Sequence, residues 1–282
     1  MGGTLRKLSV AAVAGAVAAI ALIGCGGASA DAPQQVADGI TQNDAALRQA
    51  IDAWRSAGDP PSGPPPAEVA DRAADLQDQI AFLGDHPNLV ARVMPLLSGS
   101  VRTEVGRLLA ARRALLRLSA GSNHKQLKLG QRPPLADLVG FYDEAERRFT
   151  IGANYLAAIH LVETKFGRVV NNSVAGAQGP MQFIPSTWRI YGNGGNIRDP
   201  HDAILGAARL LRANGAPGRY GPALRAYNPS GLYVAAVTQY ARLIGRDPYA
   251  LYYLYTWSRR PSRRGCRVEG RPPGPEGRWW SR

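Results

Sequence analysis

The chain has 282 residues, enough for one sizeable core or for a domain with appendages. Lysine and arginine number 34 against 21 acidic residues, and the net charge of +13 favours anionic partners such as nucleic acid, anionic lipid or acidic polymers. The two cysteines, Cys25 and Cys266, exclude a disulfide framework and a Cys-based metal site, because lipidation of Cys25 would leave Cys266 without a partner. The four histidines show no metal-ligand spacing, so we expect no metal and no cofactor.

The first 30 residues have the pattern of an export signal. Arg6 and Lys7 precede an uncharged run, residues 8–24, that is rich in Ala, Val, Leu and Ile. The run ends in LIGC, which resembles a bacterial lipobox and implies that residues 1–24 are a signal peptide and that Cys25 is lipidated. We therefore expect an exported protein that is lipid-anchored to the outer face of the membrane. Cleavage at the competing ASA site, after Ala30, would release it without a lipid, and an uncleaved anchor would also leave the body outside the membrane.

Residues 25–66 are predicted to form a proline-rich tether. Apolar residues from Ile40 to Trp54 recur at helical spacing, which predicts a short amphipathic helix that stops at Gly58. The DPPSGPPP sequence that follows, residues 59–66, has little capacity to form a helix. We expect this tether to hold the body of the protein off a membrane.

Residues 67–149 are predicted to be a helical region. Apolar stripes indicate helices over about 67–84 and 102–120, with a short helix between them that Pro95 should end. A further helix is predicted to start at the Pro133-Pro134 pair and to run to about Arg148. The arginines of the 102–120 helix lie largely off its apolar stripe, and a solvated face explains them better than a binding surface.

Residues 150–257 are predicted to be the domain that carries the chemistry. A helix over about 152–166 should stop at Gly167, and the Asp199-Pro200 pair should start a helix that runs through Arg212. Two more helical pieces are predicted, at 222–227 and 233–243. No long alternating segment requires a sheet, although a small hairpin around residues 193–195 is compatible with the sequence.

Residues 258–282 have no core pattern. They contain eight arginines and two glutamates, with Pro, Gly and the Trp279-Trp280 pair. This composition predicts a disordered basic tail.

Glu163 is the carboxylate with the clearest chemical potential. It lies beside the apolar stripe of its predicted helix and in the last turn, where the helix dipole is negative. Partial burial and the dipole should both raise its pKa. An acid that stays protonated near neutral pH is what glycoside cleavage requires of its general acid, while a surface glutamate paired with Lys165 or Arg168 is the alternative.

Two later segments offer groups that suit a sugar polymer. Residues 176–183 combine glycines, which let a backbone approach a ligand closely, with the amide of Gln182. Residues 227–230 add an aromatic ring and two polar side chains on a turn. Aromatic, amide and hydroxyl groups can stack on the apolar faces of sugars and hydrogen bond to their hydroxyl and N-acetyl groups.

Four separated pieces occur together in this part of the chain. They are Glu163, the sequence SVAGAQGPMQFIPST from Ser173 to Thr187, DPHDAI from Asp199, and the Tyr227-Asn228 pair. In order and spacing, residues 151–245 resemble the catalytic domain of lytic transglycosylases, which cut peptidoglycan glycan strands, and look closer to their membrane-bound lipoprotein branch. The resemblance implies a mainly α fold, with a lysozyme-like catalytic domain that follows a helical N-terminal region.

The resemblance also implies roles. Glu163 would protonate the glycosidic oxygen between N-acetylmuramic acid and N-acetylglucosamine, and would then act as base on the C6 hydroxyl to close a 1,6-anhydro ring. The groups expected to contact or orient the glycan are Ser173, Met181, Gln182, Tyr227 and Asn228. For Met181, a place in the core is an equally good interpretation.

Other functions differ in what they require of the sequence. A hydrolytic muramidase normally needs a second carboxylate, but Asp199 is better explained as a helix N-cap and Asp202 as a first-turn acid. A catalytically silent wall-binding protein would not need Glu163. Nucleic-acid binding is not expected, because the basic tail carries no recognised binding motif. The expected partners are therefore peptidoglycan and, through Cys25, a membrane.

Overall fold

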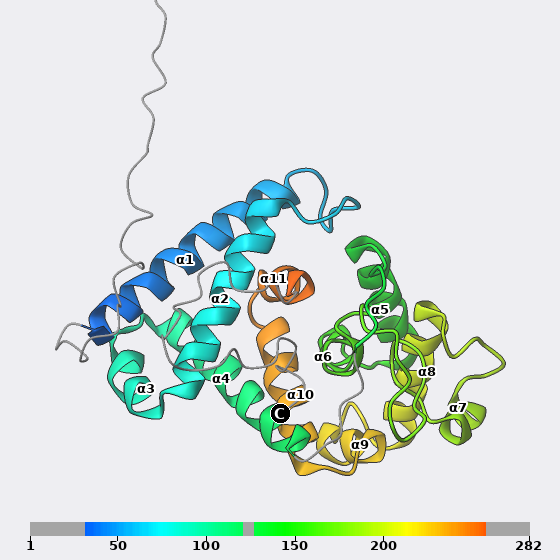
Figure 1. Cartoon of the computed structure of the whole chain (residues 1–282). Helices are drawn as coiled ribbons and strands as arrows, with labels where there is room; N and C mark the ends of the chain where they lie inside the picture. Colours follow the sequence, from blue (N-terminus) through cyan, green and yellow to red (C-terminus); the bar gives the residue numbers. More distant parts are fainter. Residues whose placement is uncertain (1–31, 121–126, 258–282) are drawn as a thin grey trace, which may run out of the picture.

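The computed structural model describes residues 32–120 and 127–257, and within them the chain is built of α-helices with no β-strand (Figure 1). The mainly α prediction is therefore confirmed. No helix of the described part is long and apolar enough to cross a membrane. The predictions for the signal peptide, for the lipidation of Cys25 and for the basic tail lie outside the described residues.

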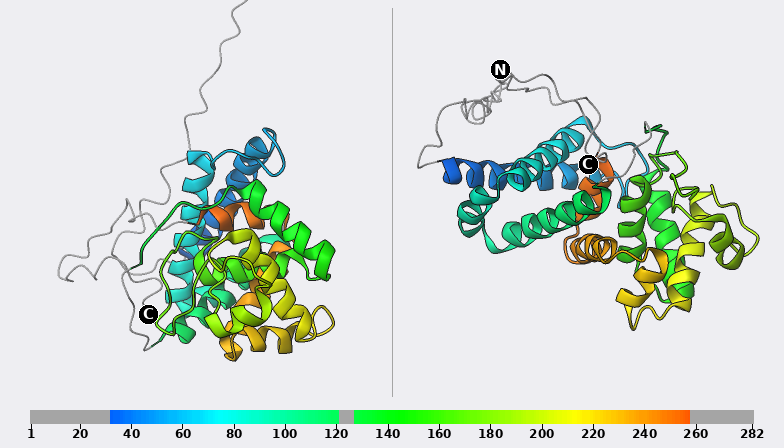
Figure 2. Two further views of the ribbon diagram at one scale, coloured as in Figure 1. Left: turned by 90° about the vertical axis from the view of Figure 1, so that its right-hand side faces the viewer. Right: turned by 60° about the horizontal axis from the view of Figure 1, so that its bottom comes forward.

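The helices form two groups along the chain. The N-terminal group contains α1 (Ala32–Arg55), α2 (Ala67–Asp85), α3 (Pro87–Val93), the short 3-10 helix η1 (Met94–Leu96) and α4 (Gly99–Ser119). The second group contains α5 (Leu135–Phe149), α6 (Ala153–Thr164), α7 (Pro185–Tyr191), α8 (Pro200–Ala213), α9 (Tyr220–Tyr227), α10 (Gly231–Ile244) and α11 (Ala250–Thr256). Figure 2 shows from two further directions that α1–α4 lie on one side of the molecule and α5–α9 on the other.

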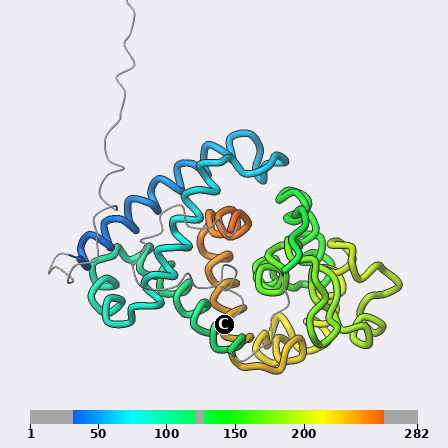
Figure 3. The backbone as a smooth tube through the Cα atoms, in the orientation of Figure 1, coloured from blue at the N-terminus to red at the C-terminus, as the bar shows by residue number. Residues whose placement is uncertain are grey.

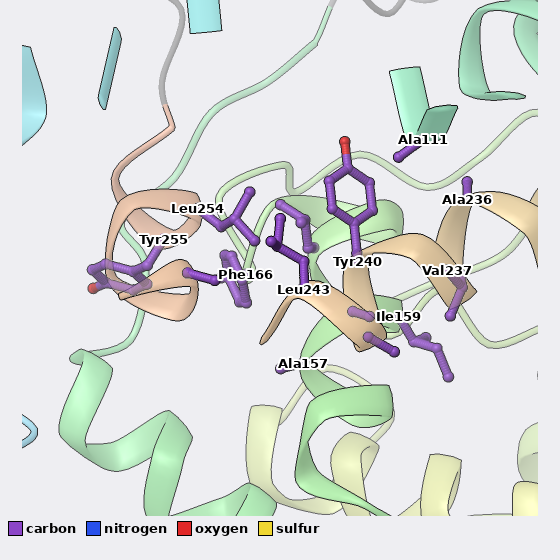
Figure 4. Packing of buried hydrophobic residues seen from close by; sticks show 14 of the residues in the cluster. Ala111, Ala157, Ile159, Phe166, Ala236, Val237, Tyr240, Leu243, Leu254 and Tyr255 are labelled. Atoms are coloured by element: carbon purple, nitrogen blue, oxygen red, sulfur yellow. The ribbon is translucent and has the colours of Figure 1, made fainter. Parts of the chain in front are cut away.

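Helix α10 is the element that joins the two groups. It packs against α4 on one side and against α6 on the other. Figure 4 shows Tyr240 pointing from α10 toward Ala111 of α4, within the same cluster that contains Ile159 of α6. Ala111 and Ile159 are both fully buried, so one continuous core runs from the N-terminal helices into the second group.

Helix α1 differs from the tether expected for residues 25–66. Its apolar stripe packs against α2, and Ile40, Leu47 and Ile51 are buried. Burying each such side chain stabilises the folded state by about 1.5–3 kcal/mol, which makes α1 part of the folded body. The following loop is also engaged, since Asp59 accepts a hydrogen bond from the Tyr252 hydroxyl of α11, beside which this loop lies in Figure 3.

Local sequence signals explain where α8 begins. The Asp199 side chain accepts a hydrogen bond from the Asp202 N–H at 2.9 Å and Pro200 occupies the first turn, which confirms the predicted start of α8. No hairpin forms around residues 193–195. Asn193 and Gly194 adopt left-handed φ angles of 52° and 78°, which a hairpin turn would also use, but the segments on either side of them are the helices α7 and α8.

Candidate active site

Helix α6 presents Glu163 at its C-terminal end. Every residue from Leu156 to Leu161 is buried, so the helix is fixed in the core on all sides before its last turn. Glu163 keeps some exposure to solvent, while the next residue, Thr164, is buried again. The carboxylate therefore sits where a rigid helix emerges at the surface, which suits a group that must meet a ligand in a fixed geometry.

The chain turns sharply just after Glu163. Lys165, Phe166 and Gly167 all have left-handed φ angles, of 54°, 59° and 80°. Such angles strain residues other than glycine, and runs of strain of this kind are found at functional sites. Phe166 is fully buried, which holds the strained turn in place.

Thr164 ties this turn to the loop that returns toward Glu163. Its hydroxyl donates to the Pro180 carbonyl at 2.5 Å and accepts from the Gly167 N–H at 3.0 Å. The glutamate, the turn and the 178–183 segment are therefore connected through one buried side chain. This contact brings together the first two pieces that were separated in the sequence.

Tyr233 is the direct partner of the glutamate. Its hydroxyl donates a hydrogen bond to Oε1 of Glu163 at 2.7 Å, and the tyrosine is 1% exposed in the first turn of α10. Burial raises the pKa of Tyr233 well above its ordinary value, so the hydroxyl stays protonated and remains a donor. The sequence predicts a helix that starts at Tyr233 but not the contact of this residue with Glu163. Its position six residues after Tyr227, with the polar Asn228 and Ser230 between them, was the available signal.

The environment of Glu163 favours the protonated acid. Burial raises its pKa from 4.5 to about 7, and the hydrogen bond from Tyr233 acts in the opposite direction by stabilising the carboxylate. The side chain keeps partial solvent contact, yet the surrounding protein removes most of its hydration. The direction agrees with the effect of burial expected from the sequence, and the result is an acid that can donate and recover a proton near neutral pH.

Tyr227 supports this pair without touching the carboxylate. Its ring lies nearly parallel to that of Tyr233, with centroids 6.3 Å apart and an interplanar angle of 6°, and its hydroxyl donates to the Met181 carbonyl at 2.6 Å. Met181 itself is 0% exposed. Of the two interpretations left open by the sequence, the structure supports a core position for the Met181 side chain over one that lines a groove, and only its carbonyl contacts Tyr227.

Residues 141–242 match the family model described as the transglycosylase SLT domain. This part of the chain is a transglycosylase SLT domain. No curated protein and no solved structure gives a significant match to the chain. The SLT match begins inside α5 and ends inside α10, so it contains Glu163, Tyr227 and Tyr233 but neither α1–α4 nor α11.

Ser173 and Gln182 shape the loop of the SLT domain that faces α6. The Ser173 hydroxyl accepts from the Ala177 N–H at 2.9 Å, and the Gln182 Nε2 donates to the carbonyls of Asn171 and Gly179 at 3.2 and 2.9 Å. Gln182 also has a left-handed φ of 48°. Both predicted glycan-binding residues therefore have a structural task, and their contact with a sugar stays a prediction.

Asn228 prepares the start of α10 in the SLT domain. Its Oδ1 atom accepts from the Ser230 N–H at 3.1 Å, and the Ser230 hydroxyl in turn accepts from the Leu232 N–H at 3.2 Å. This Asx turn followed by an N-cap fixes the first turn of the helix. Tyr233 lies in that turn, so Asn228 helps to fix the backbone that carries Tyr233, while its predicted role toward Glu163 or a sugar stays a prediction.

The two remaining acids of the SLT motifs shape the start of α8. Asp199 is its N-cap, and Asp202 accepts from the Asn196 N–H at 2.8 Å. With His201 they form a group whose candidate ligand atoms lie within 4.8 Å of one another. His201 is paired with Glu144 of α5 at 2.8 Å, so each of the three side chains also has a structural role at the start of α8.

Proposed function

We propose that the SLT domain is a lytic transglycosylase that cleaves the β-1,4 bond between N-acetylmuramic acid and N-acetylglucosamine in peptidoglycan. The observation that carries this proposal is the Glu163–Tyr233 pair: one carboxyl group with a pKa of about 7 and one hydroxyl fixed on it at 2.7 Å. Glycoside cleavage requires a protonated acid at neutral pH, and this geometry supplies one. The SLT match adds the peptidoglycan substrate class.

The pair can serve both halves of a non-hydrolytic reaction. Protonated Glu163 gives its proton to the glycosidic oxygen as the bond to C1 of N-acetylmuramic acid breaks, and the Tyr233 hydroxyl stabilises the carboxylate that is left. That carboxylate then takes the proton of the C6 hydroxyl while O6 bonds to C1. The product ends in a 1,6-anhydro ring, and Glu163 is protonated again, so no water is consumed.

Product analysis tests this reaction directly. Purified peptidoglycan digested by the protein should give fragments that end in 1,6-anhydro-N-acetylmuramic acid, which are lighter by one water than hydrolytic fragments in a mass spectrum. Reducing ends would instead show a hydrolytic muramidase on the same fold. Binding to walls without any cleavage would support a wall-binding protein.

Removing the Tyr233 hydroxyl should move the pH dependence of the reaction. In Tyr233→Phe the carboxylate of Glu163 loses its hydrogen bond, so the pKa of Glu163 rises above its present value of about 7. The alkaline limb of the pH–rate profile should therefore move to higher pH. A hydrogen bond to a charged group is worth about 1.5–3 kcal/mol, so the maximal rate should also fall roughly tenfold or more.

Tyr240→Phe is the matched control for that variant. Tyr240 is also a buried tyrosine of α10, but its hydroxyl points toward Ala111 of α4 (Figure 4), and the hydroxyl bonded to Glu163 is that of Tyr233. Its removal should leave the alkaline limb where it is. Equal profiles for the two variants would show that the Tyr233 hydroxyl does not act on the acid.

We further propose that the protein is exported and anchored to the outer face of the membrane by a lipid on Cys25. The support is the sequence pattern alone: Arg6 and Lys7, the apolar run and the LIGC end. Metabolic labelling with a fatty acid should mark the full chain, and Cys25→Ala should remove the label. A soluble mature chain that starts at Asp31 would instead indicate cleavage after Ala30.

A further inference from the structure

Four charged side chains meet where the N-terminal helices contact the segment that follows α10. They are Asp44 and Arg48 of α1, Glu104 of α4 and Asp247, which follows α10, and we call them the joint cluster. The Arg48 guanidinium bonds all three acids: Nε to Asp44 at 2.9 Å, and Nη2 to Glu104 at 2.8 Å and to Asp247 at 2.9 Å. One side chain therefore links three elements.

The joint cluster contains more acidic side chains than basic ones. A single positive charge faces three carboxyl groups, and the most buried of these is Glu104, at 4% exposure. Its Oε1 atom is buried and has no hydrogen-bond partner in the described part of the chain, and neither has the hydroxyl of Tyr253, which approaches it from α11. A buried anion with an unsatisfied oxygen is costly, whereas a protonated carboxyl group is not.

We propose that Glu104 is a proton-binding site in this joint, and that loss of its proton loosens the contact between the N-terminal helices and the segment that follows α10. The proposal does not depend on the proposed reaction. The charged and titratable groups that face Glu104 are Asp44 and Arg48 from α1, Asp247 after α10 and Tyr253 from α11.

The direction of the effect follows from the environment of the carboxyl group. Burial, and then the charges of Asp44 and Asp247, raise the pKa of Glu104 from 4.5 to about 7, against the opposing effects of the nearby Tyr253 hydroxyl and of the Arg48 charge. The folded protein therefore binds this proton about 300-fold more tightly than the unfolded chain. The stabilisation that the bound proton gives to the folded state is complete below pH 4.5. It decreases between about pH 4.5 and 7, and it is absent above pH 7.

Proton uptake linked to folding tests the proposal. The urea midpoint of the full chain, measured from pH 4.5 to 8.5, should fall between pH 5 and 7, and its pH slope gives the number of protons bound on folding. Because Glu163 titrates in the same range, the comparison uses Glu163→Gln as background. In that background, Glu104→Gln should lower the number of protons bound on folding by about one. Glu146→Gln, which changes an exposed glutamate, should leave that number unchanged. An unchanged uptake in Glu104→Gln would overturn the proposal.

A second measurement covers the case in which Glu104→Gln does not fold. Hydrogen exchange of the chain with its native Glu104, corrected for the chemical exchange rate, should show α1 and residues 245–249 less protected at pH 8 than at pH 5.5. Exposed amides of α8, remote from the joint cluster, should show equal protection at both values. Equal protection of α1 at the two pH values would mean that the joint does not respond to the proton.

Discussion

Replacing Glu163 by glutamine should lower the rate of peptidoglycan cleavage by at least about 100-fold, because a positioned general acid contributes about 10²–10⁴-fold to such a reaction. Glutamine keeps the size of the side chain and can still accept the Tyr233 hydrogen bond through its amide oxygen. It cannot give a proton to the glycosidic oxygen. Turbidity clearing of purified walls, followed by quantification of the released fragments, measures the loss.

The same variant provides its own test of folding. The pKa of Glu163 is raised by burial to about 7, so its ionised form destabilises the folded state, and this cost is present above pH 7 and absent below pH 4.5. Glu163→Gln should therefore unfold at a higher urea concentration than the native chain at pH 8, by about 1–3 kcal/mol in free energy of unfolding, and should differ little at pH 4.5. Activity that survives in a well-folded variant would refute the role of Glu163.

Adding a single methyl group at Gly179 should disrupt the loop that supports the site. A Cβ atom there would lie 1.8 Å from the Ile197 carbonyl oxygen, a contact between two backbones that no side-chain movement can relieve. The left-handed φ of 74° adds about 1–2 kcal/mol for a residue other than glycine. The 178–183 segment carries the carbonyls that bind Thr164 and Tyr227, so its displacement should also remove the activity.

Gly176→Ala separates the effect of the left-handed backbone angle from the effect of the steric clash. Gly176 has a similar φ of 83°, but an added Cβ would meet nothing within 4 Å. This variant should lose about 1 kcal/mol from the backbone angle and keep most of its activity, whereas Gly179→Ala should lose several kcal/mol. Urea unfolding of the two variants measures the difference. Equal losses would mean that the close approach of Gly179 to Ile197 is not needed.

Periodicity and capping predicted most of the long helices but not how they meet. The stripes of α2, α4 and α6 and the Asp199 N-cap were sufficient, because these signals are local. Helix α7 has only seven residues, too few for a periodic pattern, and α11 is rich in tyrosine, a modest helix former. Helix α11 is nearly all buried, so tertiary packing stabilises it, and no local pattern reports that packing.

The sequence indicated Glu163 as the candidate acid but did not indicate Tyr233 as its hydrogen-bond partner. Helix position alone left an ordinary surface glutamate as the better interpretation of Glu163, and it was chosen because the segments that follow it suit a sugar and resemble those of lytic transglycosylases. Tyr233 comes from another helix 70 residues away, and only the packing of α10 on α6 brings its hydroxyl to the carboxylate. Met181 could not be assigned from the sequence either. A methionine in a motif does not indicate whether its side chain or only its carbonyl makes the contact, and here the carbonyl binds Tyr227.

The packing of α10 between α4 and α6 also bears on how the protein can be divided for laboratory work. A fragment cut at the ends of the SLT match would begin within α5 and would strip α4 from the outer face of α10. Tyr240 and other apolar side chains of that face would then meet water, which favours aggregation. Recombinant work on the SLT domain should therefore keep α1–α4 and α11 in the expressed polypeptide.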